Sequence, residues 1–469
     1  MKLRKMVAMV LTGMMLILAL SGCSADNAET SADKPKDSSS TDTKTETETK
    51  TETKTETDSE TPASTKEPVT VVVWNQIFEE WNQEFFTQKA EEYNALGRGY
   101  VVEQSFIAGD AWTERMTAAQ AGGTAPDTYV LSYNGIVSAA RDSMILPLDD
   151  LLPAEAFNDL NDNVKEMVSY DGKYWAYPQL VEPSTVLYYR TDLFEEAGIT
   201  KVPTTWDELI EAAKKLTTND MFGLSIPDFP SMGWCTWGLQ HATSGHLAIN
   251  DNWDAPLIDQ GYIDLANFYK ECYDTGVVPE QSLAGYATMQ DFGEGNVAMK
   301  FCGSWGVAQI INDYPELADK FAVAAPPTKD GNQDTVLATN GGWTYVIDAK
   351  TDAAEGAADY ISWLLAEDIE TSAEFFQLAS YAKAAPRKSV TEYLNANAGD
   401  STWAETVNYV SAHAISEPIY PWDISVAVAL MFENTALGMM SAEDAAAETT
   451  ASIQAIIDNQ GLAGKNPRK

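Results

Sequence analysis

The sequence predicts an α/β protein whose folded part alternates strands and helices. Apolar segments typical of buried strands lie at 69–74 ("VTVVVW"), 100–106 ("YVVEQSF") and 127–131 ("DTYVL"). Segments with helical spacing follow the first two, including "AWTERMTAAQA" at 111–121. This alternation indicates βαβ units on a largely parallel sheet. Residues 69–469 are also long enough for two domains, so we expect two lobes.

The same alternation continues along the chain. Thr205 and Glu208 have the spacing of a capping box at the start of a helix. Strands are then predicted at 296–301 and 343–347, and a helix from about 353 to 366. The C-terminal hundred residues read as helical, mainly over 423–440 and 442–457. No internal repeat is visible.

The N-terminus has the order of a lipoprotein export signal. Basic residues Lys2, Arg4 and Lys5 precede an apolar run at 6–20 and small residues before Cys23. This is the order of a secretory signal peptide over 1–22, and the apolar run is short for a membrane span. Leu20-Ser21-Gly22-Cys23 resembles a lipobox, where a diacylglycerol is attached to the cysteine and a further acyl chain such as palmitate to its amino group. The alternative is an ordinary signal peptide with a chance cysteine.

Residues 23–68 form a polar segment that begins at this cysteine. It consists largely of Ser, Thr, Lys, Asp and Glu, with "TKTETETKTETKTETDSE" at 43–60. Such a composition cannot bury enough surface to offset chain entropy, so a disordered linker is expected. Together, the lipidated Cys23 and the linker predict a protein tethered to the extracellular face of the cell membrane.

Charge and cysteine content exclude several classes of protein. The net charge of −40 argues against nucleic acid or anionic lipid as partners. Beyond Cys23 only Cys235, Cys272 and Cys302 are present, too few for a disulfide framework, although one pair is possible. There is no P-loop and no GxGxxG motif, so no nucleotide cofactor is expected.

A family resemblance begins at 171–217, "DGKYWAYPQLVEPSTVLYYRTDLFEEAGITKVPTTWDELIEAAKKLT". This block resembles the signature of the family 1 extracellular solute-binding proteins, the group that contains the maltose-binding protein of ABC importers. Four further blocks agree in order and spacing, at 122–152, 292–306, 340–347 and 384–390. The resemblance implies a two-lobed periplasmic-binding-protein-like (type II) fold, in which a ligand is gripped by hinge closure. It also implies a monomeric, non-catalytic protein that delivers its ligand to ABC transporter permease subunits.

Carried onto this chain, the resemblance implies discontinuous lobes. The crossovers fall near 180–183, 336–339 and 383–386. The first lobe would then comprise about 69–181 and 338–383, and the second about 182–337 and 384–469.

The expected ligand is a sugar, which needs flat apolar walls and a few fixed polar groups. The chain has 13 Trp and 20 Tyr, most of which are expected in the core. Position within the family pattern favours Trp305, Trp422, Trp112 and Trp343 as wall residues. Gly342 precedes Trp343 and would let backbone approach the sugar. Trp234 is a weaker candidate, because Trp237 lies three residues away.

Five polar residues are candidates for hydrogen bonds to the ligand. Asn75, Gln76 and Asn134 follow strands, and open α/β sheets bind ligands at the carboxyl ends of strands. Glu182, at the first crossover, matches a carboxylate that contacts sugar in close relatives. Arg387 has the fork of donors suited to hydroxyl pairs, with a hinge salt bridge as the alternative. We expect Asp127 to hold its own loop.

Other functions remain open at the level of sequence. Relatives that bind linear maltodextrins place charged residues where Asn75, Gln76 and Asn134 stand, which puts maltose-type specificity in doubt. The same fold could carry a polyamine, a peptide or a metal chelate, and a secreted glycoside hydrolase would also use aromatic walls. The spacing of His241 and His246 does not favour zinc. Residues 250–256 cluster oxygen acceptors but lack the EF-hand pattern, so we assign no metal site, with calcium there as a minor alternative.

Overall fold

The computed structural model describes residues 67–469, except 78–79, 230, 398–400 and 402. The predicted signal peptide, Cys23 and all but the last two residues of the predicted linker lie outside the described residues. In the part of the chain that is described, no helix has the length and apolar character needed to cross a bilayer.

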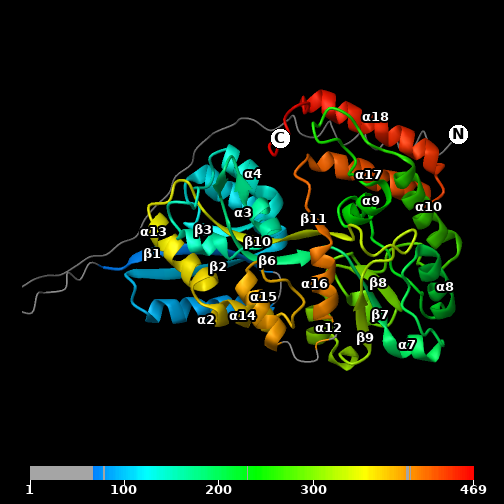
Figure 1. Ribbon diagram of the computed structural model, residues 1–469, viewed down its shortest axis with the longest axis horizontal. Coiled ribbons are helices and arrows are strands. Elements are labelled where there is room, and N and C mark those ends of the chain that lie inside the picture. Colours follow the sequence, from blue (N-terminus) through cyan, green and yellow to red (C-terminus); the bar gives the residue numbers. More distant parts are fainter. Residues whose placement is uncertain (1–66, 78–79, 230, 398–400, 402) are drawn as a thin grey trace, which may run out of the picture. The chain divides into compact units, whose positions relative to one another are not determined.

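A six-stranded sheet forms the centre of one of the two lobes (Figure 1). Its strands run in the order β11-β10-β3-β1-β2, with β6 also paired to β10. Their bounds are β1 (Val69–Ile77), β2 (Tyr100–Ala108), β3 (Thr128–Ser132), β6 (Tyr177–Pro183), β10 (Ala338–Ile347) and β11 (Ala414–Ser416).

This sheet is mixed, which corrects the prediction of a largely parallel sheet. β1 pairs in parallel with β2 and β3, as the strand–helix alternation predicts. β10 is antiparallel to both β3 and β6, although it is parallel to β11. The early βαβ units therefore form a parallel sheet, and β10, which returns from a distant part of the sequence, reverses the direction.

Helices cover this sheet and bury its apolar side chains. They are α2 (Glu80–Ala95), α3 (Gly109–Gly122), α4 (Tyr133–Arg141), α13 (Ala354–Ile361), the π-helix η3 (Ser362–Glu367), α14 (Ile369–Leu378) and α15 (Lys388–Asn397), with the shorter α5 (Ala154–Asn158) and α6 (Asp162–Met167) and the β4–β5 hairpin (Ser169–Tyr170 and Lys173–Tyr174). We call the residues that share this core the first lobe.

The second lobe is built on an antiparallel sheet, β8-β7-β9 (Met299–Cys302, Val186–Arg190 and Phe321–Ala324). Alternating side chains of β7 face two different cores. Leu187 lies in the larger core of this lobe, whereas Val186 and Tyr188 lie in a smaller core.

The helices of this lobe are α7 (Thr191–Glu196), α8 (Trp206–Leu216), α9 (Trp237–Ser244), α10 (Gln260–Asp274), α11 (Gln290–Gly293), α12 (Gly306–Asp313), α16 (Ala404–Ala412), α17 (Trp422–Ala436) and α18 (Ala442–Gln460), with 3₁₀ turns η1 (Ser231–Gly233) and η2 (Pro315–Leu317). The predicted capping box is confirmed, since Thr205 accepts from the Glu208 backbone and the Glu208 carboxylate accepts from the Thr205 backbone. Cys235, Cys272 and Cys302 are all buried and free of disulfides.

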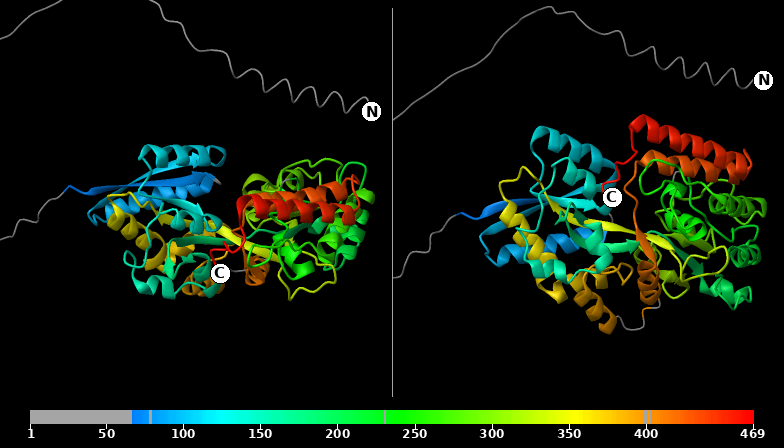
Figure 2. Two further views of the ribbon diagram at one scale, coloured as in Figure 1. Left: turned by 90° about the horizontal axis from the view of Figure 1, so that it is seen from above. Right: turned by 45° about the horizontal axis from the view of Figure 1, so that its top comes forward.

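The chain passes between the lobes along β6, β10 and β11. Val181 belongs to the first core and Val186 to the small core of the second lobe. β10 begins there with Ala338 and ends in the first core with Ile347, and Figures 1 and 2 show it leading from one set of elements into the other.

The third passage differs from the expected one. Residues 383–386 touch β6 through the bridge of Val181 to Ala384, but the chain then returns to the first core. Val390 and Leu394 of α15 lie in that core, whereas the sequence predicted residues 384–469 for the second lobe. Ala382, just before this segment, lies in the smaller core of the second lobe, and Val410 of α16 is the next residue in that core after α15.

Candidate ligand-binding site

A pocket of about 450 Å³ opens where the crossing strands meet loops of both lobes. It is lined by Gln76, Ile77, Asn82, Gly109, Ser132, Asn134, Gln179, Leu180, Glu182, Trp234, Ala287, Trp305, Gln309, Gly342, Trp343, Lys383 and Glu417. Its volume lies in the range of small-molecule sites. The lining combines indole rings, amides and a few charges.

Two of the indoles are held by one tyrosine of the second lobe. The Tyr286 ring packs edge-on against Trp234, with centroids 5.3 Å apart, and against Trp305, at 6.3 Å. Its hydroxyl donates to the carbonyl of Ser184, between β6 and β7, at 2.5 Å. The Trp305 indole Nε1 also donates to the carbonyl of Ala287 at 3.0 Å. The two rings are therefore fixed before any ligand arrives.

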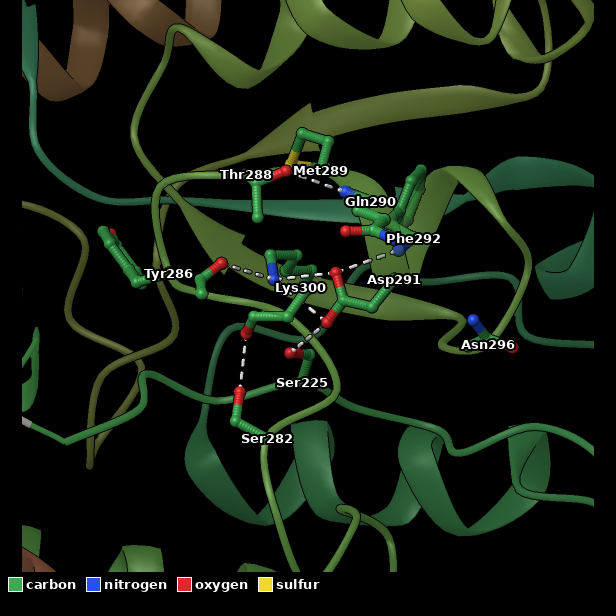
Figure 3. A network of polar contacts seen from close by, with 12 residues as sticks. Ser225, Ser282, Tyr286, Thr288, Met289, Gln290, Asp291, Phe292, Asn296 and Lys300 are labelled. Atoms are coloured by element: carbon green, nitrogen blue, oxygen red, sulfur yellow. Dashed lines mark hydrogen bonds and ion pairs between the residues drawn. The ribbon is translucent and has the colours of Figure 1, made fainter. Parts of the chain in front are cut away.

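A buried ion pair supports the loop that carries Tyr286 and Ala287 (Figure 3). Lys300 of β8 donates to both oxygens of Asp291, at 2.7 and 3.0 Å, and Ser225 donates to the same carboxylate at 2.8 Å. The Lys300 and Asp291 side chains are only 2% and 1% exposed. Farther along the loop, Gln309 donates to Ala287 and accepts from the Met289 backbone. This network ties the loop to β8.

The third indole comes from the crossing strand β10. Trp343 stands at an irregularity in the β6–β10 register, which shifts between Trp343 and Thr344. Gly342, just before it, has a φ of 128°, a backbone conformation that residues other than glycine rarely adopt. A Cβ at Gly342 would also lie 2.5 Å from the carbonyl oxygen of Leu180. The glycine thus permits the local twist at which the indole enters the pocket.

The first lobe contributes amides whose oxygens have no partner. The side-chain oxygens of Gln76, Asn82 and Gln179 are buried and accept no hydrogen bond from any residue that the structure describes. Asn82 and Gln179 are only 5% and 6% exposed. Buried polar atoms are normally paired, so three unpaired acceptors on one pocket indicate a ligand with hydrogen-bond donors.

Charged groups lie where the chain segments cross. Lys383 forms an ion pair with Glu182 at 2.8 Å, and both side chains are largely buried. Glu417 follows β11 and is half-buried. Loss of hydration, with a smaller contribution from the charge of Glu182, raises the pKa of Glu417 to about 7.

Seven of the eleven residues predicted to contact ligand line the pocket: Gln76, Asn134, Glu182, Trp234, Trp305, Gly342 and Trp343. Of the two neighbouring tryptophans, Trp234 lines the pocket, whereas Trp237 is only 3% exposed and is absent from the lining. Asp127 holds its own loop as expected, accepting from the Val72 backbone at 2.7 Å.

The other four predicted residues lie outside the pocket lining. Asn75 is buried in the first lobe, where it accepts from the Tyr345 hydroxyl and donates to Gln104. Trp112 packs against the first core. Arg387 pairs with Asp159 at 2.7 Å and donates to the Leu365 carbonyl, so a structural ion pair takes up its guanidinium.

Trp422, the fourth, begins α17 and is 49% exposed. Its ring packs edge-on against Trp237, with centroids 6.4 Å apart.

Several lining residues were missed by sequence reasoning. Asn82, Gln179, Gln309, Lys383 and Glu417 had no motif of their own. Two of them did carry a usable signal: Gln179 and Lys383 lie beside crossovers that the family resemblance implied. Glu417 follows a short strand that was not predicted at all.

The fold and pocket define the class: an α/β binding protein whose pocket is built on the strands that join its two lobes. The sequence profile described as "Bacterial extracellular solute-binding protein" matches residues 80–371. The chain belongs to this family.

Individual relatives are distant. A putative binding protein of Brucella abortus (strain 2308) is 24% identical over 250 residues, covering 52% of this chain and 59% of that protein. The arabinooligosaccharide-binding protein of Halalkalibacterium halodurans is 22% identical over 292 residues, covering 60% and 62%. The match thus spans less than two thirds of the length of these curated relatives.

Solved structures confirm the fold. The ABC transporter solute-binding protein of Thermotoga lettingae, bound with α-D-tagatose, superposes with a TM-score of 0.69 at 21% identity, covering 83% of this chain and 100% of that one.

Proposed function

We propose that this chain captures an extracellular sugar or oligosaccharide in the pocket and delivers it to the permease of an ABC transporter, without catalysis. One observation carries the proposal: three indoles and three unpaired amide oxygens converge on the same pocket. Sugar rings present C–H faces that rest on indoles, and hydroxyls at their edges donate to acceptors. The names of relatives that bind arabinooligosaccharide or tagatose agree with this ligand class.

The pocket favours a sugar over a polyamine. A polyamine site needs several convergent carboxylates around its cations. Among the described residues the lining has two carboxylates, and one of them, Glu182, is already paired with Lys383. Five amides outnumber these charges.

We further propose that the mature protein is held at the extracellular face of the membrane by lipid on Cys23. The support is the sequence order of basic residues, apolar run and lipobox-like Leu20–Cys23. Two or three acyl chains give stable anchoring, because each buried CH₂ contributes about 0.8 kcal/mol. Growth with labelled palmitate tests this: label should enter the wild-type chain and be absent from Cys23→Ser.

Calorimetry and thermal shift test the ligand class. The full chain is titrated with arabinotriose, mannobiose, maltotriose, tagatose and, as the competing class, spermidine. We expect at least one sugar to bind with about micromolar affinity, roughly −8 kcal/mol. Binding of spermidine with no response to any sugar would overturn the proposal.

Two tryptophan variants then locate the site. Trp343→Ala should weaken sugar binding at least tenfold, because it removes one indole wall. Trp422→Ala is the matched control, since it removes an indole that lies outside the pocket lining. Equal effects of the two variants would place the site elsewhere.

A further inference from the structure

Glu417 lies in a row of residues contributed by four separate chain segments. Glu182 of β6 pairs in register with Gly341 of β10. On the other side of β10, Asn340 pairs with Ser416 of β11, so Glu417 comes next, beside Gly341. Lys383 joins the row through its ion pair with Glu182. We call Lys383, Glu182, Gly341 and Glu417 the crossover row.

The glycine in this row makes room for the carboxyl group. A Cβ on Gly341 would lie 2.4 Å from Glu417 Oε1, closer than two such atoms can approach. The carboxyl therefore lies directly over the β10 backbone, at the surface of the pocket. Any residue other than glycine at position 341 would displace it.

The carboxyl group of Glu417 has no partner in the part of the chain that the structure describes. Among the described residues, none donates a hydrogen bond to its carboxyl, and the neighbouring Glu182 carries the same charge. A ligand that displaces water from this group leaves a buried carboxylate unpaired unless the ligand itself donates a hydrogen bond. The geometry thus favours a ligand that places a hydrogen-bond donor, such as a sugar hydroxyl, against the Glu417 carboxyl.

Charged and titratable groups approach Glu417 from two sides. On the pocket side these are Glu182 and Lys383. On the other side, Glu417 borders a second cavity of about 660 Å³. Its ionisable lining groups, apart from Glu417 and the Tyr420 phenol, are His241, His246, Asp251 and Arg468. Loss of hydration and, to a smaller extent, the charge of Glu182 raise the pKa of Glu417 to about 7.

We propose that Glu417 is a ligand-contacting, specificity-determining residue, and that binding of a sugar hydroxyl to its carboxyl drives a proton from Glu417 into the solvent. The sugar O–H becomes the hydrogen-bond donor, and the carboxyl proton leaves to the buffer. This inference rests on the proposed sugar-binding function. It adds that affinity depends on pH through one group.

The sign follows from hydrogen bonding. Donors favour the charged form of a carboxyl, so the bound state has a lower pKa than the free state. Affinity should rise with pH up to the free pKa of about 7 and stay constant above it. Each unit by which ligand lowers this pKa corresponds to about a tenfold gain between acidic and alkaline buffer.

Calorimetry in two buffers counts the protons. The full chain is titrated with arabinotriose, mannobiose and maltotriose in phosphate and in Tris, whose ionisation heats differ. At about pH 6.5 we expect release of about half to one proton per sugar bound, falling to zero near pH 9. Glu417→Gln should abolish the release and the pH dependence and weaken binding. Glu448→Gln, an exposed change on α18, is the control.

A second variant guards against misfolding of the first. Gly341→Ala leaves Glu417 in place but displaces its carboxyl, so it too should lose proton release. If sugar binds with no proton release, or if Glu417→Gln releases as much as wild type, the inference on Glu417 fails while the proposed function stands. If none of the sugars binds, the proposed function fails and this inference falls with it.

Discussion

The two lobes contribute opposite kinds of surface to the same pocket. The second lobe presents Trp234 and Trp305, whose rings are packed against Tyr286 and, for Trp305, hydrogen-bonded to Ala287. The first lobe presents three amides, Gln76, Asn82 and Gln179, whose oxygens accept no hydrogen bond from the described residues. The contacts that hold the second-lobe tryptophans are therefore complete without ligand, whereas the first-lobe amide oxygens gain hydrogen bonds only when a ligand binds. Rigid apolar contact and directional hydrogen bonding are thus separated between the lobes.

The largest expected effect comes from breaking the support of the second-lobe wall. Lys300→Met leaves Asp291 buried without a counter-charge, which should cost about 3–5 kcal/mol of folding free energy. The melting temperature should fall by several degrees. A double variant, Lys300→Met with Asp291→Leu, should recover most of the loss, because it removes both charges. An unchanged melting temperature for the single variant would show that the pair contributes little.

Removing one ring from that wall should affect binding more than folding. Trp305→Ala should reduce sugar affinity by about 2–3 kcal/mol, the range of aromatic anchors in binding sites. Calorimetry measures the affinity, and the melting temperature of the unliganded protein serves as the internal control. A large fall in melting temperature with little change in affinity would assign Trp305 a structural role.

Removing an acceptor from the first-lobe wall should have a smaller effect on binding and the opposite effect on folding. Asn82→Ala should lower affinity by about 1 kcal/mol, the net value of one hydrogen bond. The unliganded protein should be as stable as wild type or more so, since an unpaired buried oxygen disappears. Gln83→Ala, exposed on the same helix, is the control. Loss of stability in Asn82→Ala would mean that Asn82 is satisfied within the protein.

The smallest effect is expected outside both walls. Trp422→Ala removes a half-exposed indole and should change sugar affinity by less than about 0.5 kcal/mol, the usual range for surface substitutions. A loss as large as that for Trp305→Ala would extend the pocket to the start of α17.

Much of the fold could be predicted from sequence, because its signals are local. The strands at the N-terminus, the capping box at Thr205 and the final two helices follow from short patterns of apolar and capping residues. The direction of β10 could not be predicted, because it depends on which distant strands it joins. The packing of α15 on the first core could not be predicted for the same reason.

The site shows the same division. Asn75 and Gln76 are adjacent and equally polar, yet only Gln76 lines the pocket, and a strand of this length gives no sequence cue to which face is buried. Arg387 matched the expected chemistry, but Asp159, far away in sequence, already pairs with it. Glu182 and Lys383 are separated by 201 residues, so their ion pair is visible only in the fold.

Tyr286 gives this chain a way to change ligands without rebuilding its scaffold. Its hydroxyl donates a hydrogen bond to the carbonyl of Ser184, and its ring packs against the rings of Trp234 and Trp305. Tyr286 is buried and is not part of the pocket lining. The two tryptophans can therefore be exchanged for other side chains while Tyr286 stays in position. New cargo preferences are therefore within reach of one or two substitutions at positions 234 and 305.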